Sequence, residues 1–144
     1  MRARMVVTRP DGGVAIVSPS ANAVRWMATG GRWGNPTRGW LDEQLRRSVA
    51  AGHNEAAAHR FICAMQWGGC TTAEALAIIR DRDCLHLGTA CELCDIADLP
   101  TDRTYRNAWR RSHNGGPIWI DEHKAMVIDE ARAWAAYEAM NGRS

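Results

Sequence analysis

Short apolar runs near the start of the chain predict a β-hairpin. Residues 5–8 and 14–17 are rich in valine and isoleucine, and they flank the sequence Arg-Pro-Asp-Gly-Gly of residues 9–13. Proline presets φ for a turn, aspartate bonds its own backbone, and glycine adopts the left-handed conformation. Residues 1–20 are therefore expected to form two antiparallel strands joined by a tight turn.

From residue 21 to residue 80 the apolar positions recur every three or four residues, which predicts a helical middle. A short helix is expected over 22–28 and longer ones over 40–51, 54–67 and 71–79. Asn54 and the sequence Thr71-x-x-Glu74 supply N-caps for the last two. In the helix over 40–51 the apolar residues of one face are Leu41, Leu45 and Val49. The next helix has a predicted buried stripe of Ala57, Ala58, Phe61, Ala64 and Met65, and the third carries Ala75, Leu76, Ile78 and Ile79.

The last part, residues 81–144, has the pattern of strand, helix, strand and helix. Residues 90–96 alternate as in a strand, and residues 118–120 form a second short apolar run. Between them, Thr101 or Asp102 is expected to cap a helix that ends before Asn114-Gly115-Gly116. Asp121 is the expected N-cap of a final helix over 122–140.

That final helix gives the clearest amphipathic pattern in the chain. Its apolar stripe is formed by Val127, Ile128, Ala131, Trp134 and Ala135. Such a stripe normally faces a core, so the other segments are expected to pack against this helix.

Together these elements predict one α+β domain over residues 1–144. It would combine a hairpin (1–20), a helical middle (21–80) and a strand-helix-strand-helix part (81–144). The hairpin, 90–96 and 118–120 would share one small sheet, and helices would cover one of its faces.

The composition indicates the class of protein and its cellular compartment, but not its activity. Hydrophobic residues make up 46% of the chain and charged residues 24%, which is ordinary for a globular protein. No apolar run reaches the roughly 20 residues of a membrane span, and no signal peptide is recognised at the N-terminus. We therefore expect a protein of the cytoplasm, with no membrane partner.

Five cysteines without a secretion signal predict reduced thiols rather than disulfides.

A glycine-rich loop over 29–39 supplies the first candidate site. Arginine and tryptophan give large contact energies at protein interfaces, although a loop tryptophan also commonly plugs the core. The expected protein-contact residues are Arg32, Trp33, Arg38 and Trp40.

A second candidate lies in the predicted helix after residue 101. Three arginines at helical spacing and a fourth beside them would face phosphates, with Tyr105 or Trp109 stacking on bases. No nucleic-acid fold motif accompanies them. This alternative, a nucleic-acid-associated protein, rests on Arg103, Arg106, Arg110 and Arg111.

The third candidate is a zinc site, since cysteine and histidine are the usual zinc ligands. The four residues concerned are Cys84, His86, Cys91 and Cys94. If 90–96 is a strand, however, Cys91 and Cys94 point to opposite faces and cannot chelate together.

His59 and Cys63, four residues apart on one helix, suggest a base and a nucleophile, but their apolar surroundings favour simple packing.

Several short motifs resemble a family of small proteins of unknown function from phages and prophages of alphaproteobacteria. They lie in residues 7–13, 68–74, 81–84 and 99–125, and they consist mainly of turns, caps and core aromatics. The resemblance implies a shared fold and a phage or prophage setting, with no catalytic residue. We therefore expect a non-enzymatic accessory protein that binds or inhibits a host or phage protein, without a cofactor unless zinc is bound.

Overall fold

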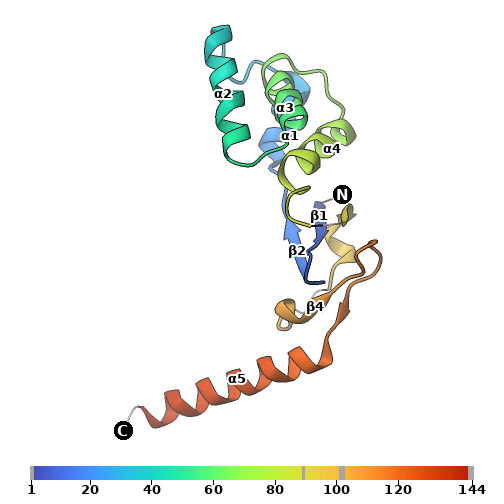
Figure 1. Ribbon diagram of the computed structural model, residues 1–144, viewed down its shortest axis with the longest axis vertical. Helices are drawn as coiled ribbons and strands as arrows, with labels where there is room; N and C mark the ends of the chain where they lie inside the picture. The colour runs from blue at the N-terminus through green and yellow to red at the C-terminus, as the bar shows by residue number, and fades with distance from the viewer. Residues whose placement is uncertain (1, 89, 101–102, 143–144) are drawn as a thin grey trace.

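A three-stranded antiparallel sheet lies at the centre of the computed structural model, which describes residues 2–88, 90–100 and 103–142 (Figure 1). Strand β1 (Ala3–Thr8) pairs with β2 (Val14–Val17) on one side and with β3 (Ala90–Asp95) on the other. In the β1–β2 turn, the Asp11 carboxylate accepts a 2.8 Å hydrogen bond from the Gly13 amide. The predicted hairpin and the predicted strand over 90–96 are thus confirmed.

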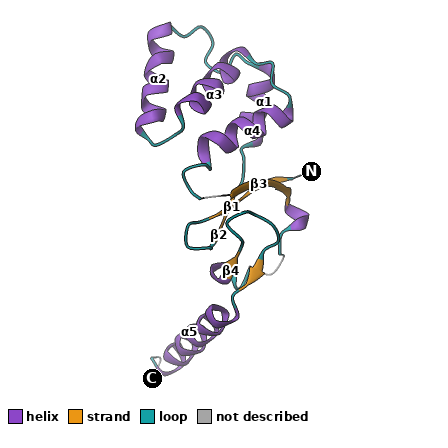
Figure 2. Ribbon diagram, turned by 45° about the vertical axis from the view of Figure 1, so that its right-hand side comes forward, coloured by secondary structure: helices purple, strands orange, loops and turns teal. Residues whose placement is uncertain are grey.

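Four helices lie at one end of this sheet (Figure 2). Asn54 and Thr71 cap two of them as predicted, since their side chains accept hydrogen bonds from the Ala57 and Glu74 amides. Helix α2 has no buried residue, and its Leu41 and Leu45 line a pocket together with residues of α3. The bounds are α1 (Ala21–Thr29), α2 (Arg38–Ala50), α3 (Glu55–Trp67) and α4 (Thr72–Asp83).

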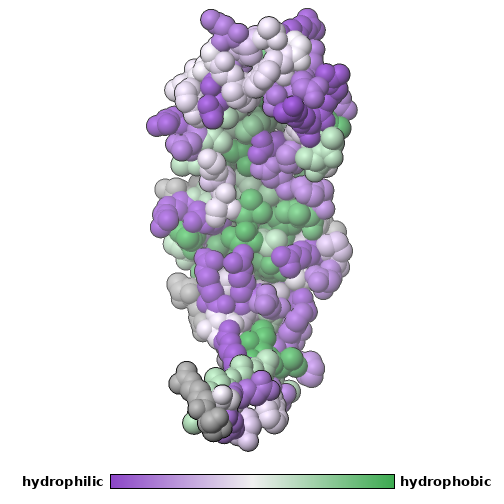
Figure 3. Space-filling model, turned by 90° about the vertical axis from the view of Figure 1, so that its left-hand side faces the viewer, coloured by the Kyte–Doolittle hydropathy of each residue, from purple (hydrophilic) through white to green (hydrophobic). Residues whose placement is uncertain are grey.

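The sheet separates two hydrophobic cores because alternate residues of a strand face opposite sides. Met5 and Val7 point toward the helices and pack with Met27, Leu76 and Ile79. On the other face the core is made by Val6, Val14, Leu99 and Trp109. Hydrophobic residues accordingly gather over the middle of the molecule, where both cores meet the sheet (Figure 3).

Two glycines let α1 and α3 end in direct backbone contact. A Cβ on Gly30 would lie 2.7 Å from the Gly68 amide nitrogen, and a Cβ on Gly68 would lie 2.8 Å from the Ala28 carbonyl oxygen. Both glycines have positive φ, near 75°. The Gly31 amide donates to the Gln66 carbonyl, and the Gly69 amide donates to the Ala28 carbonyl. These bonds hold the ends of α1 and α3 together, so the loop after α1 begins at a fixed position.

The chain after β3 departs from the prediction. The helix expected after residue 101 is wrong: this segment has a single 3₁₀ turn, η2 (Arg106–Ala108), followed by strand β4 (Trp109–Arg110). The predicted capping residues, 101 and 102, lie outside the described residues. The segment is about ten residues long, too short to be a stable helix alone, and β-pairing of Trp109 and Arg110 overrides its helical pattern.

The expected strand over 118–120 exists but does not join the main sheet. It is β5 (Trp119–Ile120), which pairs with β4 in a separate two-stranded sheet. One bridge between Gly13 and Arg110 connects the small sheet to the hairpin. A 3₁₀ turn, η1 (Ile96–Asp98), links β3 to this part of the chain.

Arg111 holds the C-terminal segment against the main sheet. Its side chain is buried, with the residue only 3% exposed, and its guanidinium reaches three partners. Nη1 donates to the Val6 carbonyl at 2.9 Å, Nε donates to the Gly116 carbonyl at 2.9 Å, and Nη2 lies 2.6 Å from a Glu92 carboxylate oxygen. The guanidinium therefore connects β1, β3 and the loop before β5 at one point.

The last helix, α5 (Glu122–Asn141), leaves the body and projects from it (Figure 1). Its predicted start is confirmed, because the Asp121 side chain accepts a hydrogen bond from the Lys124 amide. The expectation that a core forms on its apolar stripe is wrong. No residue of α5 is buried, and among its large apolar side chains Trp134 is 64% exposed and Met140 is 78% exposed.

The Arg111 contacts yield a stability prediction. The substitution Arg111→Met should lower the free energy of unfolding by about 3 kcal/mol, because it removes the donor to the buried Val6 carbonyl, the donor to the Gly116 carbonyl and the partner of Glu92. Urea unfolding followed by circular dichroism measures this change. The matched control is Arg103→Met, which removes an exposed arginine of the same segment and should change the free energy by less than about 0.5 kcal/mol. Equal effects of the two substitutions would contradict the role of Arg111.

Candidate functional site

The four residues of the predicted protein-contact loop are partly brought together. The Trp33 and Trp40 rings meet edge to face, with centroids 5.3 Å apart. Trp33 packs against the main core, whereas Trp40 is 39% exposed. The Arg32 guanidinium lies 5.6 Å from the centre of the Trp26 ring, which keeps it near the same surface. Trp33 therefore has the core-packing role, and the protein-contact role of Trp40 stays a prediction.

Gln66 positions this loop from α3. Its side-chain oxygen accepts a hydrogen bond from the Trp33 amide, and its side-chain nitrogen donates to the Gly34 carbonyl at 2.7 Å. Sequence reasoning missed this residue, because nothing in a helical glutamine indicates that it will bind a loop more than thirty residues away.

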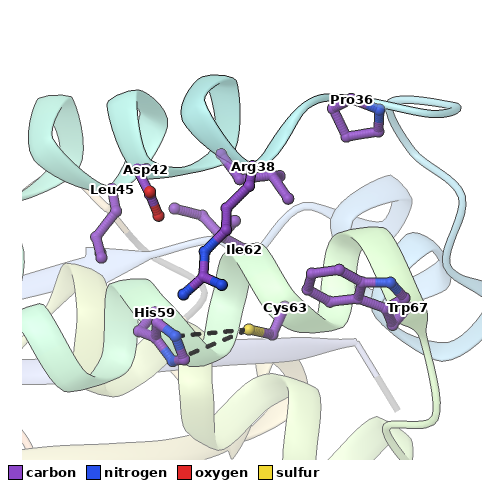
Figure 4. Close-up of a pocket in the computed structure, with 9 residues that line it drawn as sticks. Pro36, Arg38, Asp42, Leu45, His59, Ile62, Cys63 and Trp67 are labelled. Atoms are coloured by element: carbon purple, nitrogen blue, oxygen red, sulfur yellow. Dashed lines mark hydrogen bonds between the residues drawn. The ribbon is translucent and has the colours of Figure 1, made fainter.

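A pocket of about 440 Å³ lies beside the loop, between α2 and α3 (Figure 4). Arg38 reaches from α2 toward His59 and Cys63 on α3, and the remaining lining is mostly apolar. The lining residues are Pro36, Arg38, Leu41, Asp42, Leu45, His59, Ile62, Cys63 and Trp67. A concave apolar surface with one guanidinium is suited to binding rather than to a defined reaction.

The His59–Cys63 pair has little of the character of a nucleophile and base. The Cys63 sulfur lies 3.9 Å from either ring nitrogen of His59, which is long for an activating hydrogen bond. Burial raises the pKa of the Cys63 thiol, so the unreactive protonated form predominates at neutral pH. This arrangement supports the simple-packing interpretation.

The four arginines of the nucleic-acid alternative do not form one face. Arg103 and Arg106 are exposed, Arg110 lies in β4 with its Nε 3.6 Å from Asp121, and Arg111 is buried. Arg111 cannot contact a phosphate without breaking its three bonds inside the protein. The alternative therefore loses the helical stripe on which it rested.

The sheet separates one cysteine of the zinc hypothesis, Cys94, from the other two, Cys84 and Cys91. Cys91 packs on the helical face of β3 and Cys94 on the opposite face, while His86 is exposed in the loop before β3. Within the described ranges, no group of three or more His, Cys, Asp or Glu side chains is placed to hold a metal ion. The zinc hypothesis thus has no geometric support in the described part of the chain.

The surface that sequence reasoning missed lies along α5. It consists of five exposed large apolar side chains, Met126, Val127, Trp134, Tyr137 and Met140; we call this set the α5 apolar face. Among the described residues, the helix is fastened only over its first half: Tyr105 donates a hydrogen bond to Asp129 at 2.8 Å, and Arg132 donates to the Thr104 carbonyl at 2.7 Å. From 133 to 140, no side chain makes a hydrogen bond or ion pair with another described element. None of the described helices is long and apolar enough to cross a membrane.

Comparisons with protein-family models, with curated proteins and with solved structures give no match for this chain. The phage-family resemblance therefore stays a prediction from the motifs.

The cysteine environments give a labelling prediction. Cys84 is fully buried with its sulfur 3.5 Å from the Met5 sulfur, and burial, reinforced by the nearby Cys91, raises its pKa to about 12. At pH 8 only about one molecule in ten thousand would carry the Cys84 thiolate. Iodoacetamide should therefore modify Cys63 in the folded protein but Cys84 only in urea, as measured by peptide mass spectrometry. Modification of both at one rate without urea would contradict the buried position of Cys84.

Proposed function

We propose that this protein acts without catalysis, as a protein-interaction module that presents α5 to another protein. The observation that carries the proposal is the α5 apolar face on a helix that contacts the body only over its first half, among the described residues. Several large apolar side chains exposed on one element are typical of binding sites, whereas singly scattered apolar residues are ordinary. The partner would be a host or phage protein, in the cytoplasm of a phage-infected or prophage-carrying cell, as the motif resemblance implies.

The spacing on α5 fits recognition of a helix by a groove. Met126, Ala133 and Met140 recur at seven-residue intervals, so they lie along one side of a helix about 30 Å long. Tyr137 lies four residues after Ala133 and one turn before Met140, and Trp134 borders the same side. Apolar anchors at such intervals are the usual pattern of an amphipathic helix bound in a hydrophobic groove.

Two aromatic rings supply the strongest anchors of this face. Trp134 and Tyr137 meet edge to face on α5, with ring centroids 5.8 Å apart. Aromatic side chains that become buried on binding contribute disproportionately to affinity. The tryptophan loop with Arg32, Trp33, Arg38 and Trp40 lies at the opposite end of the molecule and would form a second, smaller contact surface (Figure 1).

The proposal predicts the effect of removing the anchors of the α5 apolar face. The triple variant Trp134→Ala, Tyr137→Ala, Met140→Ala should capture at least about tenfold less partner than the wild type from native-host lysate treated with nuclease. Its fold should persist, because these side chains pack on no other element and alanine favours helix. Capture is measured by quantitative mass spectrometry and the fold by circular dichroism.

A matched control removes the same number of exposed apolar side chains from other surfaces. It is the variant Trp119→Ala, Leu85→Ala, Val49→Ala, whose parent side chains are all exposed. This control should capture the same proteins as the wild type. If the α5 variant retains full capture while the control loses it, α5 is not the contact surface.

A further inference from the structure

A mostly polar pocket of about 490 Å³ lies at the base of α5, where the hairpin turn meets η2 and β4. Four cationic side chains from four separate segments line it: Arg9 from the turn, Arg106 from η2, Arg110 from β4 and Lys124 from the first turn of α5. Two of the four were among the arginines singled out in the sequence. The other two lie far away along the chain, and only the fold brings them together.

The positive charge of this pocket is incompletely neutralised. Arg110 has a carboxylate nearby, with its Nε 3.6 Å from an Asp121 oxygen. Within the described residues, no carboxylate lies within ion-pair distance of Arg9, Arg106 or Lys124. Asp11 is the one acidic residue of the lining. Four cations against the two carboxylates of Asp11 and Asp121 leave a net charge near that needed to balance a phosphate dianion.

Asp11 belongs to the turn that shapes the pocket. Its carboxylate accepts the Gly13 amide, and this hydrogen bond, with the charges of Arg110, Arg9 and Lys124, lowers the pKa of Asp11. A side chain on Gly13 would displace two groups of the pocket, because its Cβ would lie 2.9 Å from the Asp11 carboxylate and 3.4 Å from Arg110 Nη1. The turn glycine therefore leaves room for the Arg110 guanidinium across the hairpin.

A buried donor in the same lining lacks an acceptor. Trp109 is 1% exposed and lines the pocket, and its indole nitrogen has no hydrogen-bond partner among the described residues. Buried polar groups of native proteins are nearly always paired, so an unpaired one indicates a missing acceptor. An anion in this pocket would bring acceptor oxygens to a lining that otherwise consists largely of donors.

We propose that this pocket binds the phosphate group of a small phosphorylated ligand. Arginine and lysine are the side chains that recognise phosphate, arginine through paired N–H donors and lysine as a point charge. A cavity of this size is larger than a phosphate ion and falls in the range that holds a small organic ligand. The inference is independent of the proposed partner surface, which lies farther along α5.

The test is a titration of isotope-labelled full chain with inorganic phosphate, adenosine monophosphate and adenosine, followed by ¹⁵N NMR. Phosphate and the monophosphate should shift the Trp109 indole signal saturably, and adenosine should not. The variant Arg106→Gln, Lys124→Gln should bind the monophosphate at least about tenfold more weakly, since both side chains are exposed and make no internal bond that would be lost. The control Arg25→Gln, Arg60→Gln removes two exposed arginines of the helical end and should leave the affinity unchanged.

Three outcomes would overturn the proposal. The first is the absence of a saturable shift with phosphate and with the monophosphate. The second is equal affinity of the Arg106/Lys124 variant and the wild type. The third is tighter binding of a short single-stranded DNA than of the monophosphate, with a steep salt dependence, which would assign the phosphate to a nucleic-acid backbone instead of a small ligand. Substituting the α5 apolar face should change none of these results, so failure here and failure of the proposed function are distinguishable.

Discussion

The buried guanidinium of Arg111 is the interaction on which the lower half of the molecule depends. It joins the Val6 carbonyl in β1, the Gly116 carbonyl in the following loop and the Glu92 carboxylate in β3. Removing one partner of a buried ion pair costs several times the free energy that an exposed ion pair contributes. The bonds of Arg111 therefore hold the segment before α5 in one position. The Trp109 side chain fills the core beside it. The direction of α5 and the grouping of the four pocket cations both follow from this attachment.

Local signals in the sequence were sufficient for the hairpin turn and for the caps of α3 and α4. The Pro-Asp-Gly-Gly turn and the caps at Asn54 and Thr71 depend on residues only a few positions apart, and all three occur in the structure. The segment from 103 to 112 could not be predicted in this way. Its helical spacing is real, but pairing of Arg110 with Trp119 and with Gly13 decides its conformation, and those partners are distant in sequence.

The candidate sites also divide into features set by residues close in sequence and features set by residues that only the fold brings together. The Trp33–Trp40 contact was foreseeable, because both residues border one short loop. The burial of Arg111 was not, since the sequence gives it no local mark that distinguishes it from Arg103, Arg106 and Arg110, none of which is buried. The pocket of Arg9, Arg106, Arg110 and Lys124 was equally hidden, because the hairpin turn and the start of α5 meet only in the folded chain. Amphipathic spacing also misled in α5, because it predicted a core within this chain and the large apolar side chains of this helix are instead exposed.

Hydrogen–deuterium exchange of the isolated protein tests most directly whether α5 is fastened only over its first half. The account predicts strong protection of amides around Trp109 and Arg111, and protection in α5 that falls to the level of an isolated helix beyond Arg132, because short helices without tertiary contacts fray in water. Uniform protection along α5, equal to that of β1 at every protein concentration, would mean that the helix packs against the rest of the same chain, and would contradict the account.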